Sequence, residues 1–203
     1  KSYKKKYAPQ LYDLTELQRD ANKLFGYSAK ETLSLMQRLY EHHKLLTYPR
    51  TDSRYLSSDI VDTLEERIKA CAVGPYSKLA VSVLRKPIKA NKSFVDDSKV
   101  SDHHAIIPTE QFVSLSDLSD KERKIYDLVV KRFFAVLYPP FEYEQTTIKA
   151  RIGQEIFAAR GKIILSQGWK SVYENRFEEE EDSQEEMAEQ ILPDCRKGDI
   201  LKI

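Results

Sequence analysis

The sequence of 203 residues predicts an α+β protein, with a mainly α-helical domain followed by a partial antiparallel β segment. Up to about residue 138, apolar side chains recur at helical spacing behind capping residues. From about residue 142 the pattern changes to the alternation that is typical of strands. Pro139 and Pro140 lie between the two patterns and end the last helix. We therefore expect a helical domain over residues 8–141 and a β-rich domain over residues 142–203.

Pairs of capping residues indicate where three of the helices begin. These pairs are Asp13 with Glu16 (or Thr15 with Gln18), Ser28 with Glu31, and Ser119 with Glu122. Gly26 ends the first helix. The expected helices cover about residues 13–25, 28–43, 59–72, 76–85 and 119–138. Their apolar stripes are typical of core positions rather than of cofactor sites.

The β-rich part is expected to be a hairpin. One strand ends at Ile152, Gly153 makes the turn, and a second strand covers residues 155–165 before Gly168 and Trp169 break it. An acidic segment, residues 178–190, reads as a solvated loop or disordered linker. Residues 191–203 read as one last short strand.

The composition is that of a soluble globular protein, with 41% hydrophobic and 32% charged residues. No apolar run approaches the roughly 20 residues that span a bilayer, so no membrane contact is expected. The chain starts without a Met and without the apolar core of a signal peptide, which suggests a cytoplasmic piece of a longer protein. Cys71 and Cys195 lack metal-ligand spacing, and Cys71 reads as a buried structural thiol.

The net charge of +1 hides a strong segregation of charge. Residues 178–189 carry eight acidic side chains and no basic ones. The rest of the chain contains 33 basic and 24 acidic residues, a net charge of +9. Such a body suits a polyanionic partner, although basic residues that simply solvate helices would give the same count.

A candidate catalytic segment lies at Leu46–Ser53. The hydroxyl of Tyr48 is a potential nucleophile, and the guanidinium of Arg50 suits the phosphate that it would attack. An ordinary tyrosine has a pKa of about 10, so its phenolate needs a nearby cation. Asp52 and its neighbours offer side-chain hydrogen bonds to the turn, and Asp52 is also placed to orient Arg50. The alternative is a half-buried tyrosine in a turn that ends a helix.

Two further clusters of polar residues flank this segment. His103 and His104 lie in the stretch Ser101–Thr109, where no further ligand has the spacing of a zinc site, so a structural or surface role is the plain alternative. Gln37, Arg38 and Glu41 share one polar side of the preceding helix, which otherwise reads as an ordinary solvated face.

These motifs resemble, in order, those of type IA DNA topoisomerases. The octapeptide Leu46–Ser53 looks like their active-site signature in the form used by bacterial topoisomerase III. The stretch Ser101–Thr109 is similar to the family's His-containing motif. Softer matches at Leu11–Gln18, and at Gly161–Leu165 with Gly168-Trp169, extend the resemblance over about residues 8–175.

The resemblance implies that Tyr48 attacks single-stranded DNA to give a 5′-phosphotyrosine, followed by strand passage and religation. Arg50 and His103 would be the other catalytic residues, with His103 contacting a phosphate. The implied DNA-binding residues are Gln37, Arg38, Glu41, Thr47, Asp52, Ser53 and His104.

The resemblance also implies missing parts. In this family an acidic Toprim domain binds Mg²⁺, and its Asp-x-Asp-x-x-x-Glu pattern does not occur here. We therefore expect a fragment that holds no metal and cannot cleave efficiently alone, with the remaining domains of the parent enzyme as partners. The sequence has no P-loop, so ATP is not implied. The alternatives are a non-catalytic helical module that binds single-stranded DNA and a helical protein-interaction domain.

Overall fold

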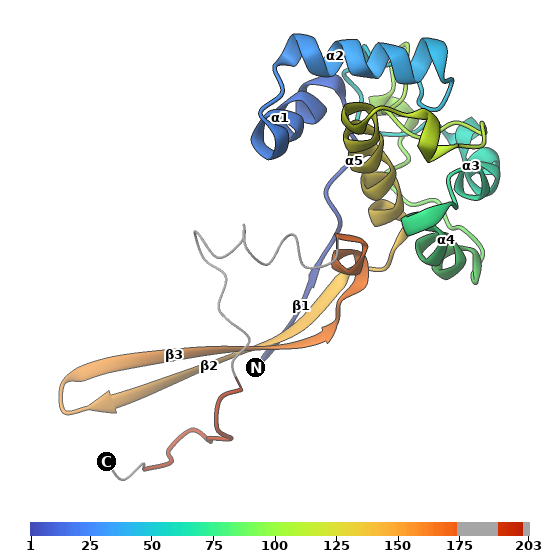
Figure 1. The fold of residues 1–203 in the computed structure, drawn as a ribbon. Coiled ribbons are helices and arrows are strands. Elements are labelled where there is room, and N and C mark those ends of the chain that lie inside the picture. Colours follow the sequence, from blue (N-terminus) through green and yellow to red (C-terminus); the bar gives the residue numbers. More distant parts are fainter. Residues whose placement is uncertain (174–190, 201–203) are drawn as a thin grey trace. The chain divides into compact units, whose positions relative to one another are not determined.

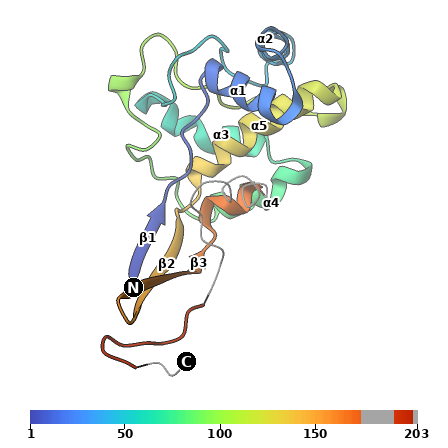
Figure 2. The ribbon, with the colours of Figure 1, turned by 90° about the vertical axis from the view of Figure 1, so that its left-hand side faces the viewer.

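The computed structural model describes residues 1–173 and 191–200 and divides the chain into two units. The helical unit is Ala8–Tyr138, and the β unit joins Lys1–Tyr7 to Pro139–Ile203. Figures 1 and 2 show the helices of the first unit and the long hairpin of the second. The predicted mixed α+β class is confirmed. The predicted acidic loop at residues 178–190 lies outside the described residues.

The helical unit is built from α-helices joined by shorter helical turns. The α-helices are α1 (Leu14–Phe25), α2 (Ala29–Gln37), α3 (Leu64–Ala70), α4 (Ser77–Leu84) and α5 (Asp120–Leu137). The 3₁₀ turns are η2 (Ser58–Thr63), η3 (Gly74–Tyr76), η4 (Asp97–Lys99) and η5 (Leu115–Asp117). One π-helical turn, η1 (Arg38–His42), follows α2 directly.

The predicted caps of α1, α2 and α5 are confirmed. Asp13 and Ser28 accept hydrogen bonds from the backbone N–H of Glu16 and Glu31, and Gly26 ends α1 with a φ of 71°. At the start of α5, Ser119 and Glu122 form the complete capping box, in which each side chain bonds to the other residue's backbone N–H. Capping chemistry therefore sets the start of each of these helices.

Helix α5 forms the core of this unit and packs against α1, α2 and α4. Its fully buried side chains include Ile125, Val129, Phe133 and Phe134. Cys71 is also buried, as predicted. The apolar stripe of α5 is therefore a core face, as its spacing indicates.

Two predicted helices change type along their length. The helix expected to reach about residue 43 becomes π-helical at Arg38, where the backbone N–H of His43 donates to the carbonyl of Arg38 at 3.0 Å. Leu39 in this turn and Leu45 and Leu46 after it are buried. The helix expected over residues 59–72 begins as the 3₁₀ turn η2, because β-branched and short polar side chains there disfavour α-helix. Thr63 in this turn donates its hydroxyl to the carbonyl of Ile60 at 2.8 Å.

The β unit is an antiparallel sheet in the order β1-β2-β3. Its strands are β1 (Ser2–Lys6), β2 (Phe141–Ile152) and β3 (Glu155–Ser166), and the 3₁₀ turn η6 (Gly168–Tyr173) follows. The hairpin of β2 and β3 turns at Gly153, as predicted. The sequence did not predict β1, which pairs Lys6 with Phe141. The predicted last strand is wrong for residues 191–200, which contain no strand, while residues 201–203 lie outside the described part.

Gly168 and Trp169 anchor the base of this sheet. The indole Nε1 of Trp169 donates to the carbonyl of Lys6 at 2.9 Å, and its backbone N–H donates to the carbonyl of Pro139 at 3.0 Å. Gly168 has a φ of 48°, and a Cβ there would lie 2.2 Å from the carbonyl oxygen of Pro140. A glycine is therefore needed for this close approach.

Candidate active site around Tyr48

The candidate tyrosine lies just after an abrupt change of chain direction. Lys44 follows η1 with a φ of 58°, which is left-handed backbone. Leu45 donates its backbone N–H to the carbonyl of Leu39 at 2.9 Å, and Leu46 forms an isolated antiparallel bridge with Pro108. The tyrosine segment thus leaves the helix and joins the stretch that carries the two histidines.

Thr47 fixes the register between these two segments. Its backbone N–H donates to the carbonyl of Ile107 at 3.0 Å, and its hydroxyl accepts the N–H of Ile107 at the same distance. The hydroxyl also donates to the carbonyl of Ala105 at 3.3 Å. These bonds occupy the side chain of Thr47, which sequence reasoning proposed as a DNA contact.

The ring of Tyr48 lies between two other rings. The centroid of the His103 imidazole is 4.2 Å away with an interplanar angle of 33°, and Tyr40 meets it edge-on at 5.6 Å. Tyr48 is half-buried and His103 is exposed. The site therefore offers a tyrosine that is packed by aromatic groups and still open to solvent beside an imidazole.

The turn after Tyr48 presents Arg50 and Asp52 to solvent and buries Thr51. The hydroxyl of Thr51 donates to the carbonyl of His103 at 3.0 Å and accepts the N–H of Ser53 at 3.1 Å. These bonds fit the prediction that side chains of this segment hold its turn. Among the described residues, Asp52 and Arg50 form no ion pair with each other, so the expected orienting contact is not observed.

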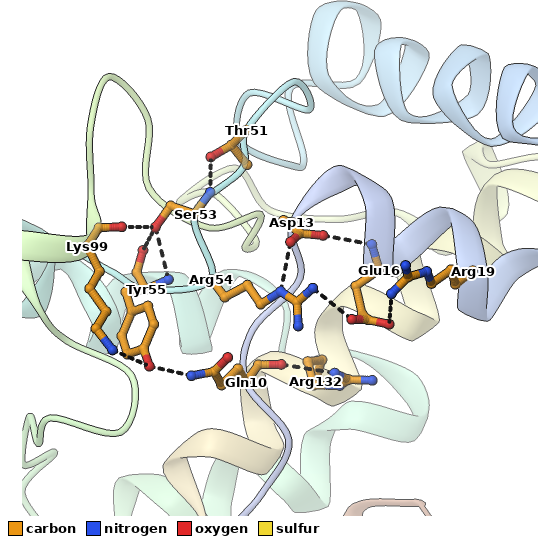
Figure 3. Close-up of polar contacts among 10 residues, drawn as sticks. All are labelled: Gln10, Asp13, Glu16, Arg19, Thr51, Ser53, Arg54, Tyr55, Lys99 and Arg132. Carbon is orange, nitrogen blue, oxygen red and sulfur yellow. Dashed lines mark hydrogen bonds and ion pairs between the residues drawn. The ribbon is translucent and has the colours of Figure 1, made fainter.

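Arg54 ties this turn to the start of α1 (Figure 3). Its Nε donates to Asp13 at 2.7 Å, and one terminal nitrogen lies 2.8 Å from a carboxylate oxygen of Glu16. Its pKa is raised, chiefly by the hydrogen bond with Asp13. A backbone bond from Leu14 to the carbonyl of Thr51, 3.1 Å long, runs beside this contact. The turn is therefore fixed to both α1 and the histidine stretch.

The polar side of the helix before Tyr48 is divided in the structure. Gln37 is half-buried and Glu41 is exposed. Arg38 reaches the N-terminus of α5, where its Nε lies 2.8 Å from Oε1 of the buried Glu122. His43 Nε2 lies 3.4 Å from the same oxygen. Arg38 therefore links two helices within this structure.

Opposing influences act on the pKa of Glu122. Burial raises this pKa, whereas hydrogen bonds from Ser119 and the charges of Arg38 and His43 lower it. The net effect is a pKa below the ordinary value of a glutamate. Glu122 is thus an anion that joins the π-helical turn before Tyr48 to α5.

His104 differs from its neighbour His103. It is half-buried, and its Nδ1 lies 2.7 Å from the carbonyl oxygen of Ala105, to which it donates. Burial is the main cause of its lowered pKa, and the charges of Arg67 and His103 add to the effect. A histidine in this setting favours the neutral form, which makes it a weaker phosphate partner than an exposed histidine.

The described residues do not bring together three His, Cys, Asp or Glu side chains that would hold a metal ion. Within the same residues, no helix is long and apolar enough to cross a membrane.

Sequence reasoning missed several residues that shape the site. Tyr40 lies within the predicted helix 28–43 without a functional signal, Glu122 is predicted only as part of a capping box, and no motif contains Arg54. The capping motif that contains Glu122 is visible in the sequence. The ion pair between Glu122 and Arg38 is not, because the two residues are far apart in the sequence. The partners of Arg54 carried a signal only as a capping pair at residues 13 and 16.

The comparisons with known proteins place the whole chain in one family. A family model described as DNA topoisomerase matches residues 1–203. This chain is 70% identical over 203 residues to the protein named DNA topoisomerase 3 from Bacillus cereus (strain ZK / E33L). It is 60% identical over 203 residues to the protein of the same name from Bacillus subtilis (strain 168). The chain spans about 28% of the length of these relatives.

A solved structure supports the same assignment at the level of the fold. Full-length topoisomerase I from Thermotoga maritima superposes with a TM-score of 0.66 at 25% identity, covering 96% of this chain and 30% of that one. With a family model along its full length and relatives of this similarity, the chain belongs to the bacterial DNA topoisomerases of type IA.

Proposed function

We propose that this chain is the tyrosine-bearing part of a type IA DNA topoisomerase and that Tyr48 is its nucleophile. The observation that carries the proposal is the stacking of the Tyr48 ring against His103 in a half-open site, with Arg50 exposed two residues later. A purely structural tyrosine would require neither the imidazole beside its ring nor an exposed guanidinium two residues later.

In the proposed reaction the phenolic oxygen of Tyr48 attacks a phosphorus of single-stranded DNA. An O–P bond to the tyrosine forms, and the bond to the 3′ oxygen breaks. The phenol loses its proton as its O–P bond forms, and the 3′ oxygen takes up a proton and leaves as a hydroxyl. The 5′ phosphate is then held as a phosphotyrosine ester. Reversal of the same step reseals the strand, and no ATP is consumed because the ester retains the energy of the bond.

The cations have separate roles in this proposal. Arg50 is the permanent charge that binds the phosphate and favours the phenolate of Tyr48. His103 contacts a phosphate beside the scissile bond. The proposed DNA contacts also include the exposed or half-buried Gln37, Glu41 and Asp52, and the already bonded Arg38, Thr47, Ser53 and His104. The last four reach DNA only by exchanging the contacts described above.

The remaining domains of the parent enzyme complete the proposal. A Toprim domain supplies the Mg²⁺ site, so this chain alone cleaves poorly. The predicted β-rich domain, residues 142–203, which lies within the β unit, forms part of the arch that opens for strand passage. Both faces of the hairpin end, residues 151–160, are exposed, with Ile156 at 70% and Phe157 at 55%. Such exposed apolar residues suit contact with the rest of the parent protein. The parent enzyme is proposed to act in the cytoplasm.

A covalent-trapping assay tests the proposal. The chain is mixed with a separately supplied Toprim-containing fragment, Mg²⁺ and labelled single-stranded DNA, and then denatured. We expect labelled protein that depends on both the added fragment and Tyr48, and none with Tyr48→Phe. The same substitution in the full-length parent serves as the reference, and an adduct that survives it there would rule out Tyr48 as the nucleophile.

The second candidate is a non-catalytic helical module for single-stranded DNA. The balance of +9 outside the acidic run favours it. Under this alternative Tyr48→Phe changes nothing, and the wild-type parent forms no adduct. A helical protein-interaction domain would instead show no salt-dependent affinity for DNA.

A further inference from the structure

A second tyrosine lies close to the candidate site and has no assigned role. Tyr55 is half-buried, and the exposed Lys99 places its ammonium 4.6 Å from the ring centroid. The same ammonium lies 3.3 Å from the Tyr55 hydroxyl, which also accepts a hydrogen bond from Gln10 (Figure 3). An aromatic ring beside a lysine is the combination with which proteins hold single nucleic-acid strands.

The backbone holds this pair in place through Ser53. The buried hydroxyl of Ser53 donates to the carbonyl of Lys99 at 2.8 Å and accepts the N–H of Tyr55 at 3.1 Å (Figure 3). Ser53 belongs to the segment that begins with Tyr48. The position of Tyr55 and Lys99 is therefore coupled to the turn that presents Arg50.

Hydrogen bonds also place Tyr55 close to the Tyr48 segment. Ala105 donates its N–H to the carbonyl of Tyr55 at 2.9 Å, while its carbonyl accepts the hydroxyl of Thr47. Tyr55 and Thr47 thus flank the same residue, and Thr47 directly precedes Tyr48. The backbone of Tyr55 is therefore joined through Ala105 to the residue that precedes Tyr48.

More cations precede Lys99 on an anchored loop. Leu56 bridges Val95 in parallel, which fixes the end of this loop beside Tyr55. The segment 85–95 contains no acidic residue, and its basic side chains are exposed without ion pairs in the described part of the chain. These are Arg85, Lys86, Lys89 and Lys92. Asp96 and Asp97 lie between this stretch and Lys99, so residues 85–99 carry five basic and two acidic side chains, a balance that suits phosphates.

We propose that Tyr55 and Lys99 form a subsite for single-stranded DNA beside Tyr48, in which Tyr55 stacks a base and Lys99 contacts a phosphate. The subsite takes unpaired DNA, because a ring reaches a base face only where that base is unstacked from a neighbour. This inference rests on the proposed function only in that the strand is the one that Tyr48 attacks.

Equilibrium binding of this chain to a single-stranded oligonucleotide containing 2-aminopurine tests the subsite. Tyr55→Ala should raise Kd about five- to hundredfold and abolish the fluorescence quenching that stacking produces. Tyr55→Phe keeps the ring and should bind within about twofold of wild type, although it loses the hydroxyl bonds to Gln10 and Lys99. Lys99→Gln should lower the slope of log K against log salt by about 0.7, the value for one phosphate of a single strand.

Matched controls are Phe112→Ala and Lys30→Gln, since Phe112 is 72% exposed and Lys30 is also exposed. Neither should change Kd or the salt slope. The subsite is rejected if folded Tyr55→Ala binds as wild type does, or if Tyr55→Phe loses as much affinity as Tyr55→Ala. If Tyr55→Ala fails to fold, the salt slope of Lys99→Gln decides.

The outcomes also separate the subsite from the proposed function. Wild type that binds DNA while the Tyr55 and Lys99 variants match it would reject the subsite alone. Wild type that binds no single-stranded DNA, even at about 50 mM salt, would reject both.

Discussion

At the scale of single residues, the candidate site depends on which hydroxyls are free. Thr47, Thr51 and Ser53 all use their side chains to join the tyrosine segment to neighbouring chain. The Tyr48 hydroxyl, in contrast, belongs to a half-open ring beside His103. The same short segment thus separates residues that hold its shape from residues that meet solvent.

Thiol reactivity is a prediction at this scale. Burial raises the pKa of the Cys71 thiol to about 12, so at about pH 8 it remains protonated and covered. Cys195 is only partly covered. An aromatic disulfide reagent should therefore modify Cys195 alone in the folded protein and both cysteines in denaturant, as read by mass spectrometry. Rapid native labelling of Cys71 would contradict its burial.

At the scale of elements, Glu122 is expected to make stability depend on pH. Its pKa is depressed in the folded protein, so its stabilising effect is present above the unfolded value of about 4.3 and is lost as pH falls through the lower folded value. Glu122→Gln keeps the shape of the cap but removes the charge that faces Arg38. We expect a loss of about 1–3 kcal/mol in the free energy of unfolding at about pH 7.

Urea unfolding of wild type and Glu122→Gln across pH checks this expectation. The difference between them should shrink as pH falls from about 5 to about 3, because the wild-type carboxylate becomes protonated. Glu41→Gln is the control, since Glu41 is exposed on the adjacent turn. A difference that stays constant over this pH range would show that the charge of Glu122 has no part in it.

The two glycines of the β unit give a matched pair of substitutions. Gly168→Ala adds a Cβ 2.2 Å from a carbonyl oxygen at a φ of 48°, and should cost about 2–4 kcal/mol. Gly153→Ala has a similar φ of 61° but nothing within 4 Å, and should cost only about 1–2 kcal/mol.

Trp169 provides the measurement, because it is the only tryptophan and packs directly after Gly168. Its fluorescence in urea reports the unfolding of the β unit. Equal effects of the two substitutions would mean that the close approach to Pro140 does not limit the residue at 168.

Local signals predicted most elements of the fold, and distant pairing explains what they missed. Capping pairs and apolar spacing predicted α1, the start of α2, and α5, because these depend on residues within one or two turns. Strand β1 was not predicted, since Ser2–Lys6 has little strand character and is ordered by pairing with β2. The π-helical turn at Arg38 was also not predicted, since apolar spacing does not reveal the backbone bonds from His43 to Arg38 and from Leu45 to Leu39.

The candidate site shows the same division. The motif at Leu46–Ser53 predicted Tyr48 and Arg50 as site residues, the separate stretch Ser101–Thr109 predicted His103, and the structure brings Tyr48 and His103 together. The links from Arg54 to Asp13 and from Arg38 to Glu122 join different helices and loops. The sequence shows that these residues are charged but not which distant residue each one pairs with, so these ion pairs could not be predicted.

At the scale of the whole molecule, the segregation of charge should govern how tightly the chain binds DNA. The eight acidic residues at 178–189 reduce a balance of +9 to a net charge of +1. Replacing each Glu by Gln and the Asp by Asn should strengthen binding to single-stranded DNA about tenfold at low salt, because the long-range repulsion of phosphates is removed. The gain should disappear near 1 M salt, where the Debye length falls to about 3 Å.

A variant that keeps the composition of residues 178–189 but scrambles their order is the control for this prediction. Because its charge is unchanged, its affinity should match that of wild type at every salt concentration. If the scrambled segment also strengthened binding, or if the neutral segment kept its advantage at high salt, a specific contact rather than net charge would account for the effect. Equal affinity of all three proteins at low salt would show that the acidic run lies too far from the bound DNA to be felt across a Debye length of about 10 Å.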